Sequence, residues 1–196
     1  MVAKRSSRAQ DILQALARML ENSRGGRITT AALASELGVS EAALYRHFPS
    51  KTRMYEGLID FIEETIFARV TSIINDESDA VNQCYRIISL TLTFAEKNAG
   101  ISRLLHGDAL TGETERLHQR IAQLFSRLES QLKQILREAE INQGLKINPS
   151  VSVATNIMLA ILEGKISQFV RSDFTQPPTQ YWSEQWPLLE NQLFIQ

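Results

Sequence analysis

Residues 38–51 read GVSEAALYRHFPSK, and this stretch decides how the N-terminal part of the sequence folds. A short helical pattern, TTAALASELG at 29–38, comes before it, and the turn Gly38-Val39-Ser40 separates that pattern from a second short helix predicted over 41–47. Two short helices joined by a turn of three or four residues that contains glycine are typical of a helix-turn-helix. The same spacing also occurs at a plain corner of a helical bundle, so spacing alone leaves both interpretations open.

The residues of the turn have identifiable roles. Gly38 can adopt the left-handed conformation that reverses the chain. Ser40 can accept a hydrogen bond from the free amides at the start of the next helix. Pro49 ends that helix, and Ser50 can cap the one that follows. The stretch therefore predicts a helix, a turn, a second helix and the start of a third.

The helix at 41–47 carries large side chains that cannot all enter a core. If Leu44 faces inward, Phe48 lies near it one turn later, whereas two alanines, Tyr45 and Arg46 point outward. Such a face suits a helix in the major groove of DNA, because small side chains permit close approach to the bases. The phosphates on either side would then be contacted by Tyr45, His47 and Lys51.

The formal net charge of −1 hides an asymmetry along the chain. Residues 1–58 carry nine Lys or Arg and five Asp or Glu, a balance of +4. The remainder carries 12 of the 21 bases and 17 of the 22 acids, a balance of −5. A basic module on an acidic body favours contact with a polyanion through the N-terminal part, although an uneven surface alone would give the same numbers.

Composition limits the class of protein. The 196 residues are 43% hydrophobic, which is enough for a folded core. The longest apolar run, IMLAIL at 157–162, is too short to cross a bilayer, and no secretory leader opens the chain. The single Cys84 permits no internal disulfide, which suits a reducing compartment. We expect a cytoplasmic protein.

Helical periodicity extends over most of the chain, whereas no stretch alternates as a strand would. We predict an all-α fold of about nine helices, with a small N-terminal domain at 1–50 and a larger helical domain at 51–196. Helices after the first three are expected from Ser50, over 79–97 and 100–105, from 115 onward, from Pro149 in its first turn to about Arg171, and around Trp182.

Two apolar stripes near the C-terminus predict a seam between two copies of the chain. One runs along the helix that ends near Arg171, and the other follows the Pro-Pro break, where two tryptophans are four residues apart. Two such helices from each subunit would form a four-helix interface, and the two-fold axis predicts a palindromic DNA site. The tryptophans could equally be core residues. The predicted interface residues are Ile157, Ile161, Phe169, Trp182 and Trp186.

Other kinds of chemistry have little support. The three histidines, at 47, 106 and 118, are scattered, and Cys84 has no neighbour at a metal-site spacing. No glycine-rich phosphate loop occurs, and no Ser-His-acid set can be singled out. We therefore expect no enzyme, no metal and no cofactor. The basic stretch KRSSR at 4–8 could be an arm that reaches a minor groove, or a solvated tail.

The segment ITTAALASELGVSEAALYRHFPSKTRMYEGLIDFIE at 28–63 resembles the DNA-binding domain of TetR-type regulators, in which a Gly-Val-Ser turn leads to a Leu-Tyr-x-His-Phe-x-x-Lys segment. The match covers about residues 10–60, and the helical remainder fits the larger dimerisation domain of that family. The resemblance implies that Ala42, Ala43 and Arg46 approach the bases. It also implies DNA contacts at the motif positions Thr30, Ser40, Tyr45, His47 and Lys51.

Three segments, at 27–54, 101–110 (ISRLLHGDAL) and 169–174 (FVRSDF), resemble a branch of this family that acts in nucleoid occlusion. This resemblance covers nearly the whole chain. It implies a nucleoid-associated dimer that binds palindromic DNA and inhibits assembly of the division GTPase FtsZ over the chromosome, which times cell division.

The same resemblance implies that the C-terminal tail of FtsZ binds between the fourth and fifth helices. The matching positions are Phe61, Arg69, Leu90, Thr93, Lys97 and Asn98. Thr93 and Lys97 depart from the expected residues, and lysine in place of arginine keeps the charge but loses the bidentate geometry. An ordinary edge of helix packing would carry similar residues.

Two other functions remain open. A TetR-type transcriptional repressor would release its operator when a small ligand enters a pocket among the C-terminal helices. A pure interaction protein would use its helix-turn-helix only as a structural corner. Sequence-specific binding of a palindromic duplex at physiological salt argues against the interaction protein, and effector-induced release of DNA identifies the repressor.

Overall fold

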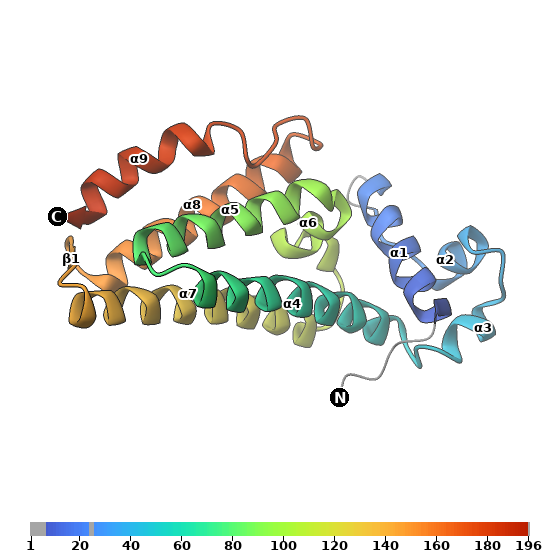
Figure 1. Cartoon of the computed structure of the whole chain (residues 1–196). Helices are drawn as coiled ribbons and strands as arrows, with labels where there is room; N and C mark the ends of the chain where they lie inside the picture. Colours follow the sequence, from blue (N-terminus) through green and yellow to red (C-terminus); the bar gives the residue numbers. More distant parts are fainter. Residues whose placement is uncertain (1–6, 24–25, 196) are drawn as a thin grey trace. The chain divides into compact units, whose positions relative to one another are not determined.

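The computed structural model describes residues 7–23 and 26–195, and almost all of its regular structure is helical (Figure 1). Over these residues it contains nine α-helices and one pair of two-residue strands, so the predicted all-α class is confirmed. The basic stretch at 4–8 lies largely outside the described residues. The helices are α1 Ser7–Asn22, α2 Thr30–Glu36, α3 Glu41–Tyr45, α4 Lys51–Asp76, α5 Ala80–Lys97, α6 Ala99–His106, α7 Glu115–Asn142, α8 Val151–Arg171 and α9 Trp182–Leu193.

Short elements complete the fold. The 3-10 turn η1, Asp108–Leu110, follows α6. The strands β1, Lys146–Ile147, and β2, Phe194–Ile195, pair antiparallel. No sequence pattern predicted this pairing, because strands of two residues are too short to show alternation. Among the described residues, no helix combines the length and apolar character that a membrane span requires.

The start of α8 corrects one prediction. Pro149 was expected in the first turn of this helix, but the N-cap is Ser150, whose Oγ accepts a hydrogen bond from the amide of Val153 at 3.4 Å. A serine cap satisfies an amide that would otherwise have no partner, so the helix begins after Ser150 rather than at the proline.

The chain divides into two compact units. Unit 1 contains the residues up to 63 together with 98–121, and unit 2 contains 64–97 with 122 onward. Helices α4 and α7 each contribute residues to both. The domain boundary between residues 50 and 51 stays a prediction.

In unit 1, α1 packs closely against α6. Gly100 allows this approach, because a Cβ atom there would lie 1.9 Å from the carbonyl oxygen of Ala17. The first half of α4 adds buried side chains at Met54, Leu58 and Ile62, which recur every four residues along the helix. Helices α1, α6 and this half of α4 therefore supply much of the core of unit 1, and α2 and α3 add the buried side chains of Leu33 and Leu44.

Unit 2 contains an aromatic cluster that anchors α9. The indole Nε1 of Trp182 donates a hydrogen bond to Ser89 Oγ at 2.8 Å. The ring of Tyr85 stacks on Trp182 at 6.2 Å and lies 5.4 Å from Trp186, which also neighbours Phe194 at 6.3 Å. Both tryptophans are buried within the single chain.

The only cysteine of the chain is also in unit 2. Cys84 lies on α5 and is completely buried. Burial, with a smaller contribution from the charge of Asp79, raises the pKa of its thiol to about 12.

Thr155 on α8 gives a prediction about stability. Its side chain is fully buried, and its Oγ1 has no hydrogen-bond partner among the described residues. Thr155→Val replaces the hydroxyl with a methyl group of the same shape, so we expect the free energy of unfolding to rise by about 1 to 2 kcal/mol. Urea denaturation measures this.

Thr91 on α5 provides the matched control for that substitution. It is 1% exposed, but its Oγ1 donates a hydrogen bond to the carbonyl of Ile87 at 2.9 Å. Thr91→Val should leave stability unchanged or lower it by up to about 1 kcal/mol. Equal effects of the two substitutions would contradict the distinction between a paired and an unpaired hydroxyl.

Candidate nucleic-acid interface

Local capping shapes the helix-turn-helix. Thr29 caps α2 by accepting a hydrogen bond from the amide of Ala32 at 3.1 Å. Gly38 has φ +63°, the left-handed conformation predicted for it. Ser40 caps α3 through a hydrogen bond from the amide of Ala43 at 3.3 Å. Two short helices therefore meet at a sharp turn, with α3 beginning at a capped, outward-facing N-terminus.

Helix α3 has one buried side and one exposed side, as its projection predicted. Leu44 and the following Phe48 are buried at 1% and 8% exposure. Tyr45 is 41% exposed. Among the other predicted contact residues, Ala42, Arg46 and His47 are exposed, and Ala43 is half-buried. The helix ends at Tyr45 with Arg46 as its C-cap, slightly before the predicted end at 47.

A chain of hydrogen bonds joins α2 to α3. The hydroxyl of Tyr45 donates to Thr30 Oγ1 at 3.3 Å, and Thr30 Oγ1 donates to Glu41 Oε2 at 2.5 Å. Two residues predicted to contact DNA, Thr30 and Tyr45, are thereby adjacent. Glu41 was not among the predicted site residues, although an acidic residue in the first turn of a helix is a recognisable signal.

The beginning of α4 carries the last predicted DNA contact. Ser50 Oγ accepts a hydrogen bond from the amide of Arg53 at 3.2 Å, which is the predicted cap. The ammonium group of Lys51 forms an ion pair with Glu113, and its side chain is 19% exposed. Glu113 lies 62 positions later in the sequence, so sequence reasoning had no signal for this partner.

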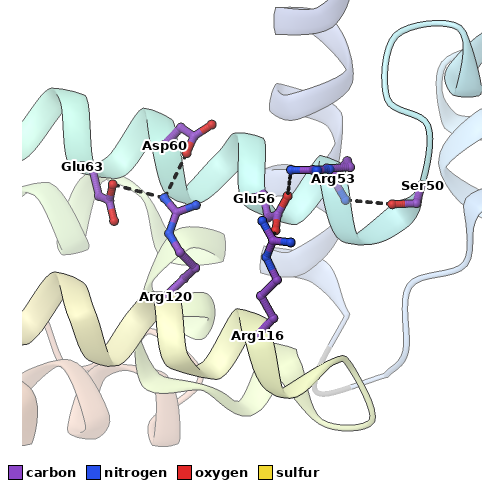
Figure 2. A network of polar contacts seen from close by, with 7 residues as sticks. All are labelled: Ser50, Arg53, Glu56, Asp60, Glu63, Arg116 and Arg120. Atoms are coloured by element: carbon purple, nitrogen blue, oxygen red, sulfur yellow. Dashed lines mark hydrogen bonds and ion pairs between the residues drawn. The ribbon is translucent and has the colours of Figure 1, made fainter.

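Figure 2 shows how α4 and α7 are joined within unit 1. The carboxylate of Glu56, whose side chain is only 5% exposed, lies 2.7 Å from Arg53 Nη1 and 2.7 Å from Arg116 Nε. One turn further along, Arg120 Nη2 contacts Asp60 at 3.0 Å and Glu63 at 3.1 Å. The ion pairs of Arg116 and Arg120 connect α7 to α4.

The pKa of Arg120 is set by two opposing effects. Burial lowers the pKa of its guanidinium, but the hydrogen bonds and charges of Asp60 and Glu63 outweigh this effect, so its pKa lies above the ordinary value. Arg120 is therefore a permanent cation between two carboxylates.

The predicted FtsZ-binding residues lie on α4, α5 and the link to α6. Phe61 is 43% exposed and belongs to unit 1. Arg69 and Lys97 are exposed in unit 2. The remaining three are half-buried: Leu90, Thr93 and Asn98. Their contact with a partner stays a prediction.

The predicted dimer residues differ in burial. Ile157 and Ile161 are half-buried on α8, whereas Phe169, Trp182 and Trp186 are buried at 3%, 3% and 6% exposure. The large apolar side chains that α8 and α9 do expose are Val153 at 42% and Leu188 at 69%. Sequence reasoning missed these two, because tryptophan is the stronger signal for any apolar contact.

Comparison with known proteins shows which family of proteins the chain matches. Residues 12–58 match the family of bacterial regulatory proteins of the tetR type, and residues 78–194 match the tetracyclin repressor-like C-terminal domain of the SlmA-like kind. Solved structures agree on the fold. FadR from Bacillus halodurans gives a TM-score of 0.83 at 14% identity over 96% of this chain and 97% of that one. PfmR from Thermus thermophilus gives 0.73 at 22% identity over 91% and 96%.

Curated relatives narrow the class further. The chain is 55% identical over 192 residues to the nucleoid occlusion factor SlmA of Shewanella sp. strain MR-4, covering 98% of each chain. It is 56% identical over 187 residues to the SlmA of Shewanella woodyi, covering 95% of each. The chain therefore belongs to the TetR family of bacterial regulatory proteins, in its branch of nucleoid occlusion factors.

Proposed function

We propose that this chain acts in nucleoid occlusion as a dimer that binds a palindromic DNA sequence and inhibits FtsZ assembly over the chromosome. The observation that carries the proposal is the identity of 55% to a nucleoid occlusion factor over 98% of both chains. Such a protein would be cytoplasmic and associated with the nucleoid.

The exposed side of α3 supports DNA binding. Ala42 and Arg46 are exposed on a helix whose opposite side, at Leu44, is buried. A small residue beside a guanidinium permits close approach to base edges, and arginine can donate two hydrogen bonds to a guanine. The positive N-terminus of α4, capped by Ser50, favours a phosphate nearby. Arg46 is thus the proposed base contact, and the α4 end is a proposed phosphate contact.

A dimer through α8 and α9 would supply the second half of the DNA contact. The partly exposed residues Val153, Ile157 and Ile161 lie along one side of α8, and Leu188 is exposed on α9. Burial of these side chains against the same helices of a second copy would remove apolar surface from water. Two α3 helices related by a two-fold axis would read the two halves of a palindrome.

The proposed FtsZ contact uses cations and an exposed aromatic ring. Arg69 and Lys97 are exposed, and Phe61 is the exposed large apolar residue on α4. Basic and aromatic side chains suit a short peptide that bears acidic and apolar residues.

Co-sedimentation with FtsZ polymers tests this function. We expect the protein to pellet with the polymers and to disrupt them more strongly when its palindromic duplex is present. Lys97→Glu should lower the recovered fraction about threefold to tenfold, because it places a negative charge against an acidic tail. Lys146 on β1 is also exposed, so Lys146→Glu is the control with the same change of charge, and it should change the recovered fraction little.

Two further results would distinguish DNA binding from the interaction with FtsZ. Arg46→Ala should abolish the effect of the duplex while leaving DNA-independent co-sedimentation intact. Wild-type protein that binds the duplex but never pellets with FtsZ would contradict the division role and leave a DNA-binding regulator.

A ligand-gated repressor is the second candidate, and it would need a pocket for its ligand among the C-terminal helices. A depression of about 480 Å³ lies between the end of α4, the start of α5 and α7. Its lining includes the carboxylates of Asp76, Glu77 and Glu138. Pockets for small organic ligands are mostly lined by apolar and aromatic side chains, so this lining does not favour an apolar effector.

A further inference from the structure

Glu113 lies in unit 1, in the short segment between η1 and α7, and its side chain is 7% exposed. Its Oε1 is 2.5 Å from the ammonium nitrogen of Lys51 and 3.9 Å from Nε of Arg27. One buried carboxylate thus faces two cations, Lys51 and Arg27. Both cations are close in sequence to the proposed DNA-contacting helices α2 and α3.

The position of this carboxylate is fixed by its surroundings. The amide of Glu113 donates a hydrogen bond to the carbonyl of Leu110 at 2.9 Å. Three residues later, Arg116 contacts the buried carboxylate of Glu56, and Arg120 bridges two further acids on α4 (Figure 2). The ion pairs of Arg116 and Arg120 therefore attach the start of α7, just after Glu113, to α4, and they hold the backbone of Glu113 close to Lys51.

We propose that Glu113 is an internal competitor of the DNA phosphate for Lys51, and that it lowers the affinity of the protein for DNA backbone. The proposal rests on the proposed DNA-binding function. An ammonium group has three donors, so Lys51 can contact carboxylate and phosphate together. The two anions nevertheless repel each other, and a neutralised cation releases fewer condensed counterions from DNA.

This arrangement has a functional consequence. Binding to arbitrary sequence depends almost entirely on phosphate contacts. A protein with one phosphate contact weakened from within depends more on its base contacts to stay bound. Glu113 would therefore lower the affinity for arbitrary and palindromic sequences by a similar factor, so that the weakly bound bulk chromosomal DNA is left largely unoccupied.

Glu113→Gln tests the proposal directly. The amide keeps the shape of the side chain and can still accept a hydrogen bond from Lys51, but it carries no charge. Fluorescence anisotropy should show about fivefold tighter binding to both a palindromic and a scrambled duplex. The slope of log K against log salt should steepen by about 0.9, the value of one phosphate contact.

Glu115→Gln is the control, because it changes the net charge equally two residues away on the exposed start of α7. It should shift affinity far less. In a Lys51→Met background, Glu113→Gln should have no effect on affinity, because the ammonium group for which carboxylate and phosphate compete is absent. If Glu113→Gln lowers the melting temperature enough to impair folding, Glu113→Asp, which withdraws the carboxylate by one methylene, should still tighten binding.

The failures are distinguishable. If wild-type protein shows no preference for any palindromic duplex, the proposed DNA-binding function is wrong. If the wild type binds but Glu113→Gln matches Glu115→Gln, or binds more weakly, only the competition is overturned. Weaker binding would instead identify Glu113 as a residue that positions Lys51 for the phosphate.

Discussion

Gly100→Ala is expected to lower the free energy of unfolding by about 3 kcal/mol or more. The added Cβ would lie 1.9 Å from the carbonyl oxygen of Ala17 and 2.9 Å from its carbonyl carbon. These are backbone atoms of α1, so no side-chain rotation can relieve the contact. The two helices must separate, and α1 is part of the core that supports the helix-turn-helix. Urea denaturation followed by circular dichroism measures the loss.

The sign of this result distinguishes packing from helix propensity. Alanine is a better helix former than glycine by about 1 kcal/mol, so an unobstructed Gly100→Ala would stabilise the protein. Ala122→Gly on the exposed side of α7 measures that bare propensity difference in this chain. A stabilising Gly100→Ala would show that α1 and α6 do not approach as closely as the structure describes.

Trp182→Ala is expected to cost about 3 to 5 kcal/mol of stability. The substitution removes a side chain that is 3% exposed, deletes the stacking with Tyr85 and leaves Ser89 without its indole partner. Because this cluster anchors α9, the helix should detach, and half of the proposed dimer seam should be lost with it. Denaturation at fixed protomer concentration and sedimentation equilibrium measure the two effects.

Leu188→Ala is the matched control on the same helix. Leu188 is 69% exposed in the protomer, so its truncation should change protomer stability by less than about 0.5 kcal/mol. If α9 belongs to the dimer seam, the same substitution should weaken self-association. A Trp182→Ala protein with wild-type stability would contradict the core role of the cluster.

Local patterns predicted most of the fold. The stripe of Met54, Leu58 and Ile62 is buried, because a period of 3.6 residues places these side chains on one side of α4. Gly38 and Ser40 adopt their predicted conformations, since turn and cap chemistry depend only on neighbouring residues.

Those local patterns did not predict contacts between segments that are far apart in the sequence. The pairing of Lys51 with Glu113 and the bridge from Arg120 to Asp60 depend on how helices are arranged in space, and many other pairings would satisfy the same charges. Trp182 shows a related limit. Sequence hydrophobicity indicates that a side chain will be buried, but it does not distinguish burial within a protomer from burial between two copies.

The environment of Cys84 makes the protein suitable for site-specific labelling. A thiol that is fully buried, with a pKa of about 12, has almost no thiolate at neutral pH and resists alkylation. A cysteine introduced on the surface can therefore be labelled selectively with a maleimide dye while the native residue remains in place. Fluorophores for anisotropy, or spin labels that report distances between two copies, can be attached without first removing a core side chain.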